Sequence, residues 1–199
     1  MKLIIGNKNY SSWSLRGWLA CKQSGLSFDE ILVPMFGEDW EAKKRAEGDL
    51  TPSSGKVPVL WDGDADGDAV AWDSLAILEY LADKGGSDRF WPKDDAARAM
   101  ARAMVAEMHS SYLSLRRECP MNIRVRHENV KISETTRHDV VRILGLWAEA
   151  RARFGSGGPF LFGTFGAADI FYAPVVSRFI TYGFGVPGFA QSYMQAVWT

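Results

Sequence analysis

Residues 2–25 read KLIIGNKNYSSWSLRGWLACKQSG, which is an apolar run, a polar loop and a helical pattern in succession. The run over 2–5 has the length of a short buried strand and stops at a glycine and an asparagine. Ser11 and Ser12 are good helix-capping residues, and Gly25 follows the last helical position. The stretch therefore predicts a strand followed directly by a helix.

The same alternation of element types continues to about residue 84. Further strands are expected over 28–33, 57–61 and 69–71, and further helices over 38–47 and from Ser74 onward. The order β-α-β-α-β-β-α predicts an α/β domain over 1–84, in which two helices join parallel strands and the last strand returns through a hairpin.

Strand patterns stop after a glycine-containing linker at 85–91. Helices are expected over 94–117, 134–154, 167–180 and 189–198, so a second, all-α domain is predicted over 92–199. The segment 159–176 is almost wholly apolar, but a carboxylate at its centre, Asp169, would cost roughly 3 kcal/mol in a bilayer. We expect a buried helix there and no membrane span.

The net charge, the cysteine spacing and the first apolar run argue against several classes of function. The 199 residues carry a net charge of −1, which gives no support for nucleic-acid binding or a polybasic membrane surface. The two cysteines, Cys21 and Cys119, have neither metal-like nor redox-like spacing and favour a reduced compartment. The first apolar run is too short for a signal peptide. A cytoplasmic protein is therefore expected.

Two patterns in the sequence have some features of metal sites. Residues 62–73 place carboxylates at positions 1, 3, 5 and 7 of a calcium-type loop, with glycine at position 6. The loop closes with Asp73 in place of a bidentate glutamate, and it follows a strand rather than a helix, so an acidic hairpin turn is the preferred interpretation. His109, His127 and His138 lack zinc-ligand spacing. We expect no metal.

Four local motifs, in order along the chain, resemble those of the cytosolic glutathione transferase family. The first, Tyr10–Arg16, is similar to the zeta-class Ser-Ser-Cys-Ser-Trp-Arg signature, with Trp13 in place of the cysteine. The second, Val57-Pro58, is similar to the family's strand entry, and the third, Asp73-Ser74, to its acidic-Ser-x-Ala-Ile motif. The fourth, Phe165–Ile170, is similar to the family's Ser/Thr-x-x-Asp capping motif, with Gly166 in place of the hydroxyl residue. The resemblance implies a thioredoxin-like N-terminal domain followed by an all-helical C-terminal domain.

The resemblance also implies a function and a site. It implies a glutathione transferase, acting as a homodimer in detoxification, that stabilises the thiolate of glutathione for attack on an electrophilic small molecule. Ser12 and Ser11 are the expected thiolate donors, and Ser14 competes with them. The residues expected to hold glutathione are Trp13, Lys56, Val57, Pro58, Asp73 and Ser74, with a cis Val57–Pro58 bond.

A methionine-bearing stripe on the helix over 94–117 suggests where the electrophile binds. Met108, Tyr112 and Arg116 are the expected acceptor-pocket residues, although such a stripe is more often plain core. Glutathione is the only co-substrate expected, with no metal and no nucleic-acid or membrane partner.

Two other functions stay open at this point. The first is a zeta-like glutathione-dependent isomerase, which Trp13 in the cysteine position makes less favoured. The second is a non-catalytic binding or assembly module with the same fold. The joint presence of Ser11, Ser12, Asp73 and Ser74 argues against the second, because a scaffold needs none of them together.

Overall fold

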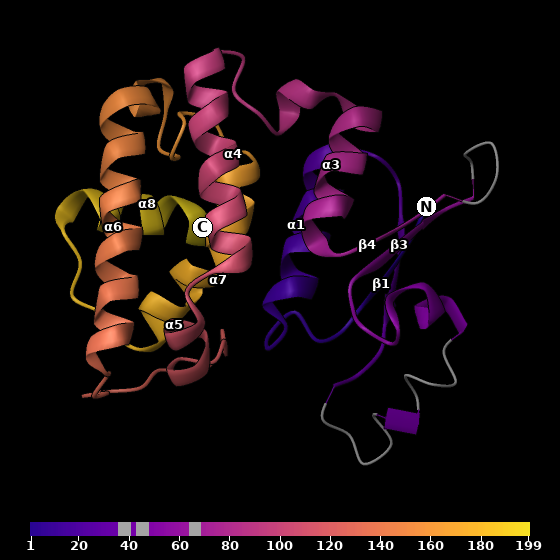
Figure 1. The fold of residues 1–199 in the computed structure, drawn as a ribbon, viewed down its shortest axis with the longest axis horizontal. Helices are drawn as coiled ribbons and strands as arrows, with labels where there is room; N and C mark the ends of the chain where they lie inside the picture. Colours follow the sequence, from indigo (N-terminus) through magenta and orange to yellow (C-terminus); the bar gives the residue numbers. More distant parts are fainter. Residues whose placement is uncertain (36–40, 43–47, 64–68) are drawn as a thin grey trace. The chain divides into compact units, whose positions relative to one another are not determined.

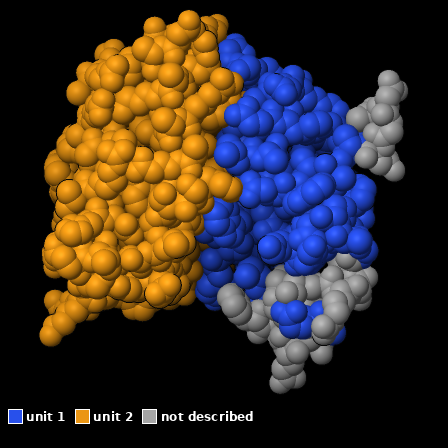
Figure 2. All heavy atoms as spheres, in the orientation of Figure 1, with its two compact units in different colours: residues 1–89 blue, residues 90–199 orange. Residues whose placement is uncertain are grey.

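The computed structural model describes residues 1–35, 41–42, 48–63 and 69–199. The described chain divides into two compact units, Met1–Arg89 and Phe90–Thr199 (Figure 2). The division falls inside the linker expected at 85–91. The helix expected over 38–47 lies almost entirely outside the described residues.

The first unit contains a four-stranded sheet with the order β2-β1-β3-β4. The strands are β1 (Lys2–Ile5), β2 (Asp29–Leu32), β3 (Val59–Asp62) and β4 (Ala69–Trp72). β1 and β2 are parallel, whereas β3 is antiparallel to both β1 and β4. The expectation that both helical connections join parallel strands was therefore wrong for the second one. Alternating burial determines which face of a sheet a side chain occupies, but it carries no information about strand direction.

Other elements pack on both faces of the two central strands, β1 and β3, whereas the four residues of the edge strand β2 are exposed. Helices α1 (Ser12–Ser24) and α3 (Ser74–Gly85) pack against each other on one face (Figure 1). On the other face, Ile4 and Val59 pack with Val33 and with Leu50 of a short 3-10 helix, η1 (Gly48–Ser53). Apolar residues alternate between the two faces, as the strand periodicity requires.

The second unit is helical (Figure 1). Its helices are α4 (Asp95–Ser110), α5 (Leu113–Glu118), α6 (Glu134–Phe154), α7 (Ala167–Thr181) and α8 (Gly188–Trp198). Two short 3-10 turns lie beside them: η2 (Ser87–Arg89) precedes α4, and η3 (Gly155–Gly157) follows α6.

The single helix expected over 94–117 is in fact two helices, α4 and α5. The chain breaks at Tyr112, whose φ of 63° is left-handed. Its hydroxyl donates to Glu107 at 2.6 Å, and the Arg116 side chain donates to the Ser111 carbonyl at 3.0 Å. These side chains stabilise the break, although the helical period of the sequence continues through it.

The core of the helical unit centres on Trp147 of α6. This ring is fully buried and lies edge-on to Tyr172 of α7 and Tyr193 of α8, with centroids 5.7 and 4.8 Å away. At the start of α7, the buried Asp169 carboxylate accepts the backbone N–H groups of Gly166 and Leu161 at 2.9 and 3.1 Å. Only this half of a capping box is possible, because glycine has no side chain to complete it.

The apolar segment that contains Asp169 belongs to this core. Within the part of the chain that the structure describes, no helix combines the length and apolar character that crossing a membrane requires.

Candidate functional site

A cavity of about 800 Å³ lies in the first unit. Its size falls within the range of small-molecule sites. The described residues that line it are Ser11, Trp13, Met35, Pro52, Ser53, Ser54, Gly55, Lys56, Val57, Pro58, Trp72, Asp73 and Ser74. Every predicted glutathione contact is among them, together with Ser11, whereas Ser12 is not.

Ser11 contributes its hydroxyl at the start of α1. It is the N-cap residue, and its Oγ accepts the Ser14 backbone N–H at 3.1 Å. Because the oxygen serves the helix as an acceptor, the hydroxyl hydrogen remains to be donated elsewhere. No acceptor for that hydrogen is found among the described residues. Ser11 can therefore cap the helix and donate to an anion at the same time.

The two neighbouring serines are placed differently. Ser12 is the first residue of α1; it is buried and does not line the cavity. Ser14 is fully buried, and its Oγ accepts the Gly6 backbone N–H at 2.9 Å, which ties α1 to the end of β1. Of the three serines, Ser11 alone lines the cavity.

The chain segment before β3 forms a second wall. The Val57–Pro58 peptide bond is cis, which confirms the sequence expectation. Gly17 of α1 lets the helix approach this proline, because a Cβ atom there would lie 2.9 Å from the ring carbon Cγ of Pro58. Ser53 holds the preceding turn, since its Oγ donates to the Lys56 carbonyl and accepts the Lys56 N–H at 3.0 Å.

The start of α3 forms a third wall. Asp73 is its N-cap residue, with φ 79° and ψ 135°, and its Oδ1 accepts the Leu75 N–H at 2.8 Å. A non-glycine residue in such a conformation stores about 1–3 kcal/mol of strain, and strain of this kind gathers at ligand sites. The Ser74 Oγ is buried and has no hydrogen-bond partner among the described residues. An unsatisfied buried hydroxyl costs roughly 1–3 kcal/mol, so it favours a ligand contact here.

The electrostatics of the cavity suit a molecule with both signs of charge. Lys56 and Asp73 are the charged side chains among its described lining residues. The starts of α1 and α3 add the partial positive charge of helix N-termini. The arrangement can bind a zwitterionic, peptide-like molecule and stabilise an anion beside Ser11.

The predicted acceptor residues lie together at the junction of α4 and α5. Met108 is buried, and burial raises the pKa of the Tyr112 hydroxyl, as does its hydrogen bond to Glu107. The Arg116 guanidinium donates to the carbonyl oxygens of Ser111 and Met108. These contacts all serve the local fold, and a role in acceptor binding stays a prediction.

Neither cysteine supplies a nucleophile. Both thiols are free and buried, and burial raises the pKa of Cys21 to about 12 and that of Cys119 to about 11. Thiols with such pKa values stay protonated at neutral pH.

The first carboxylate of the calcium-type loop, that of Asp62, is already bonded to other side chains of the protein. Asp62 is buried and accepts the Tyr80 hydroxyl at 2.6 Å together with the Lys84 ammonium. Residues 64–68 of the loop lie outside the described part of the chain. Among the described residues, no group of three or more histidine, cysteine or acidic side chains is arranged to hold a metal ion.

Several lining residues had no signal in the sequence. Met35, Ser53 and Ser54 reach the cavity only because the chain folds back beside the recognised motifs. The positive φ of Ser54, 55°, followed by a glycine at 77°, marks a tight turn next to Lys56. The turn chemistry of a Ser-Gly pair is the one local cue that could have indicated this wall.

Comparisons with known proteins identify the family of both units. A model of the glutathione S-transferase N-terminal domain matches residues 10–84, and a model of the C-terminal domain of the same family matches residues 133–196. A search of curated proteins finds no significant match.

Solved structures share the fold over the whole chain. A glutathione transferase homologue from Burkholderia, solved with bound glutathione, is 22% identical with a TM-score of 0.70, covering 100% of this chain and 91% of that one. A theta-class glutathione S-transferase from Xanthomonas axonopodis pv. citri, also with glutathione bound, is 23% identical with a TM-score of 0.63, covering 98% and 91%. A zeta-class bacterial maleyl pyruvate isomerase is 18% identical with a TM-score of 0.67, covering 98% and 91%. These structures show the shared fold, and the two domain models, which match residues 10–84 and 133–196, establish that the chain belongs to the glutathione S-transferase family.

Proposed function

We propose that this protein is a glutathione transferase, which binds glutathione in the cavity of its first unit and stabilises the thiolate for attack on an electrophilic small molecule. The observation that carries the proposal is the meeting of the Ser11 hydroxyl, the Val57–Pro58 segment and the start of α3 around one cavity. Two of the similar structures were solved with bound glutathione, which supports the same ligand here.

Thiolate stabilisation is the central chemical demand. A thiol with a pKa of about 8.5 is only about 3% ionised at neutral pH, and lowering its pKa by about two units requires roughly 2.7 kcal/mol. One hydroxyl donor to an anion contributes about 1.5–3 kcal/mol, and a helix N-terminus about 0.3–2 kcal/mol. The two contributions suffice together, so no basic side chain is needed.

Ser11 is the favoured thiolate donor. It lines the cavity, and its Oγ already accepts the Ser14 N–H, which directs its hydrogen away from the helix. Ser12 is the second candidate, because its hydroxyl belongs to the first turn of the same helix. Ser14 is the weakest of the three, because it is fully buried and does not line the cavity.

The remaining walls would hold the tripeptide. The Asp73 carboxylate can pair with the α-ammonium group of the γ-glutamyl residue, and the buried Ser74 Oγ can bind its carboxylate at the start of α3. The backbone beside the cis bond at Val57 can pair with the cysteinyl unit, and Lys56 supplies a cation for the glycine carboxylate. Trp13 adds an aromatic wall.

A turnover assay separates this proposal from its alternatives. Conjugation of glutathione to a generic chloroarene should proceed well above the uncatalysed rate. A protein that binds glutathione in calorimetry but gives no turnover with chloroarenes or other electrophiles would be the non-catalytic module. Isomerisation without conjugation would indicate the zeta-like isomerase, and a failure to bind glutathione would contradict both the transferase and the isomerase.

We further propose that the protein acts in the cytoplasm, in detoxification, as a homodimer. Two free, buried cysteines are compatible with a reducing compartment. Light scattering on a size-exclusion column tests the assembly, since a dimer has twice the 22.2 kDa mass of the chain. Cell fractionation tests the compartment.

A further inference from the structure

A long segment without regular secondary structure joins α5 to α6 in the helical unit. Residues 119–132, called the strap below, form neither helix nor strand, and the structure describes all of them. Connections of this length without structure of their own are uncommon in compact domains, and ordered ones usually have a functional role. The proposed transferase chemistry assigns no role to this one.

The first half of the strap is attached to the C-terminal end of α7 through its own backbone. Three side chains donate to three strap carbonyls: Arg178 Nε to Cys119 at 2.9 Å, Tyr182 Oη to Pro120 at 3.0 Å and Thr181 Oγ1 to Asn122 at 2.9 Å. In the opposite direction, the backbone N–H of His127 donates to the Thr181 carbonyl at 2.7 Å. Because these bonds follow one another along one stretch of chain, we expect them to break together.

Opening this half of the strap would uncover two buried groups. The Cys119 side chain is fully buried, and Arg178, which donates to its carbonyl, is only 4% exposed. Burial lowers the pKa of Arg178 to about 10, which means that its charge is less favourably solvated here than in water. Water would reach this cation in the open state, so its hydration offsets part of the cost of opening.

The second half of the strap has no comparable attachment. Residues 128–131 are exposed, and residues 128–132 form no hydrogen bond with the described part of the chain. The next residue, Ser133, is the N-cap of α6. This half is therefore held at Ser133.

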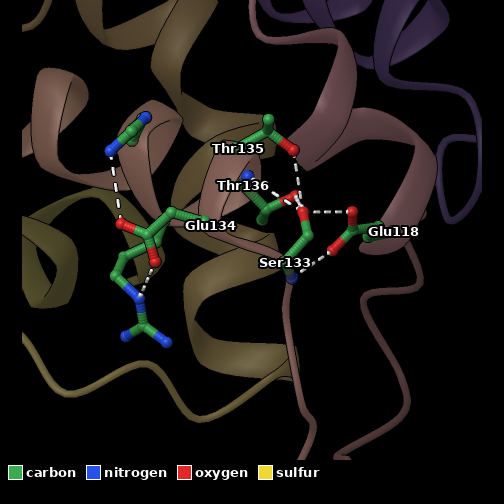
Figure 3. Close-up of polar contacts among 7 residues, drawn as sticks. Glu118, Ser133, Glu134, Thr135 and Thr136 are labelled. Carbon is green, nitrogen blue, oxygen red and sulfur yellow. Dashed lines mark hydrogen bonds and ion pairs between the residues drawn. The ribbon is translucent and has the colours of Figure 1, made fainter.

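A contact between Glu118 and Ser133 joins the two ends of the strap. The backbone N–H and the hydroxyl of Ser133 both donate to the Glu118 carboxylate, at 2.9 and 2.5 Å (Figure 3). The Ser133 Oγ also accepts the Thr136 N–H at 3.2 Å and so caps α6. A carboxylate is favoured beside a helix N-terminus, and the hydrogen bonds from Ser133 lower the pKa of Glu118, so it stays ionised. The strap is thus closed into a loop at its base.

We propose that the strap opens as one unit of local unfolding, and that the Glu118–Ser133 contact controls how often it opens. Joining the two ends restricts the conformations available to the strap once it leaves α7, which makes the open state less favourable. Opening would expose the Cys119 thiol and the His127 N–H while the core around Trp147 stays folded. The proposal goes beyond the glutathione chemistry and does not rest on it.

The test follows the reaction of Cys119 with 4,4′-dithiodipyridine in the full chain carrying Cys21→Ala, which leaves one thiol. The Cys119 thiolate attacks one sulfur of the reagent, the reagent's S–S bond breaks, a mixed disulfide forms and thiopyridine is released, while the thiol proton goes to the buffer. We expect labelling at least about 100-fold slower than that of a free cysteine, because the thiol reacts in the open state. The rate should change little at low urea concentrations, since local opening exposes little surface.

Two variants weaken the contact by different means. Glu118→Gln removes the charge of the acceptor, and Ser133→Asp keeps a good N-cap but places a second carboxylate beside Glu118. Both should speed labelling by roughly three- to tenfold. Glu118→Lys combined with Ser133→Asp restores an attraction between opposite charges and should label more slowly than Ser133→Asp alone. The matched control is Glu149→Gln, which removes an exposed glutamate of α6 that pairs with Arg153 at 2.9 Å and should leave the rate unchanged.

Hydrogen exchange supplies a readout that does not depend on ionisation of the thiol. Exchange of the His127 N–H, which is bonded to Thr181, should accelerate by the same factor as labelling in Glu118→Gln and Ser133→Asp, whereas the Trp147 N–H should be unaffected. Unchanged labelling in both variants, labelling as fast as that of a free cysteine, or labelling only where urea unfolds the helical unit would each overturn the proposal. Equal acceleration at Trp147 would also overturn it, because the contact would then stabilise the whole unit.

Discussion

Replacement of Ser11 tests the proposed thiolate donor, because this residue has two separable functions. Its oxygen caps α1 through the Ser14 N–H, and its hydrogen is proposed to stabilise the thiolate. Ser11→Ala removes both functions. Ser11→Asp keeps a good N-cap but replaces the donor by a negative charge, and Ser11→Thr keeps both the cap and the hydroxyl.

The two losses have different magnitudes and different readouts. Loss of the cap should lower the free energy of unfolding by about 0.5–2 kcal/mol in Ser11→Ala, which urea unfolding measures. Loss of the donor, about 1.5–3 kcal/mol, corresponds to an increase of roughly one to two units in the pKa of bound glutathione. At neutral pH the thiolate fraction then falls by at most about 25-fold, and the drop in rate is partly offset because a more basic thiolate is a better nucleophile.

The assay is the pH dependence of kcat/KM for chloroarene conjugation, together with calorimetric affinity for glutathione. Ser11→Ala should shift the profile to higher pH while affinity changes little, Ser11→Asp should shift it further, and Ser11→Thr should restore it. An unchanged profile in Ser11→Ala with a shifted one in Ser12→Ala would transfer the role to Ser12. Unchanged profiles in alanine variants of Ser11, Ser12 and Ser14 would support a non-catalytic protein.

Three further predictions concern binding and stability. Asparagine at position 73 keeps the helix cap and tolerates the positive φ. Asp73→Asn should nevertheless weaken glutathione binding by about 1.5–3 kcal/mol in calorimetry. Equal affinity would refute the pairing of the Asp73 carboxylate with the α-ammonium group of glutathione. Burial raises the pKa of Asp169 to about 6, so its contribution to stability is present below about pH 4 and is lost as pH rises through about 6. The stability deficit of Asp169→Asn relative to the parent should therefore shrink by up to roughly 3 kcal/mol between pH 4 and 7 in urea unfolding, and a deficit that grows would contradict this. Trp147→Ala should cost about 3–5 kcal/mol, whereas Val141→Ala on the exposed face of the same helix should change stability by less than about 0.5 kcal/mol; a small effect at Trp147 would disprove its central place in the core.

Local signals predicted the ends of several elements well. Gly25 is a cap residue in the structure as expected, and the helices after residue 133 begin and end within about one residue of their predicted bounds. These boundaries follow from capping chemistry, which is local in sequence. The cis bond at Val57–Pro58 was predicted through family resemblance, since most such bonds are trans.

The predictions that failed depend on contacts that the hydrophobic periodicity of the sequence does not encode. The direction of β3 depends on the path of the chain before Val59, which no periodicity encodes. The break at Tyr112 depends on its hydrogen bond to Glu107, while the helical spacing on either side stays regular. Ser11 and Ser12 differ by about 100° around the helix axis, and a serine pair in the sequence does not show which of them faces a cavity.

The structure of the protein soaked with glutathione tests the central claim most directly. The account predicts the tripeptide in the cavity of the first unit, with its sulfur within hydrogen-bond distance of the Ser11 Oγ and its γ-glutamyl end at Asp73 and Ser74. Glutathione bound elsewhere, or a cavity that stays free of it at saturating concentration, would contradict the account.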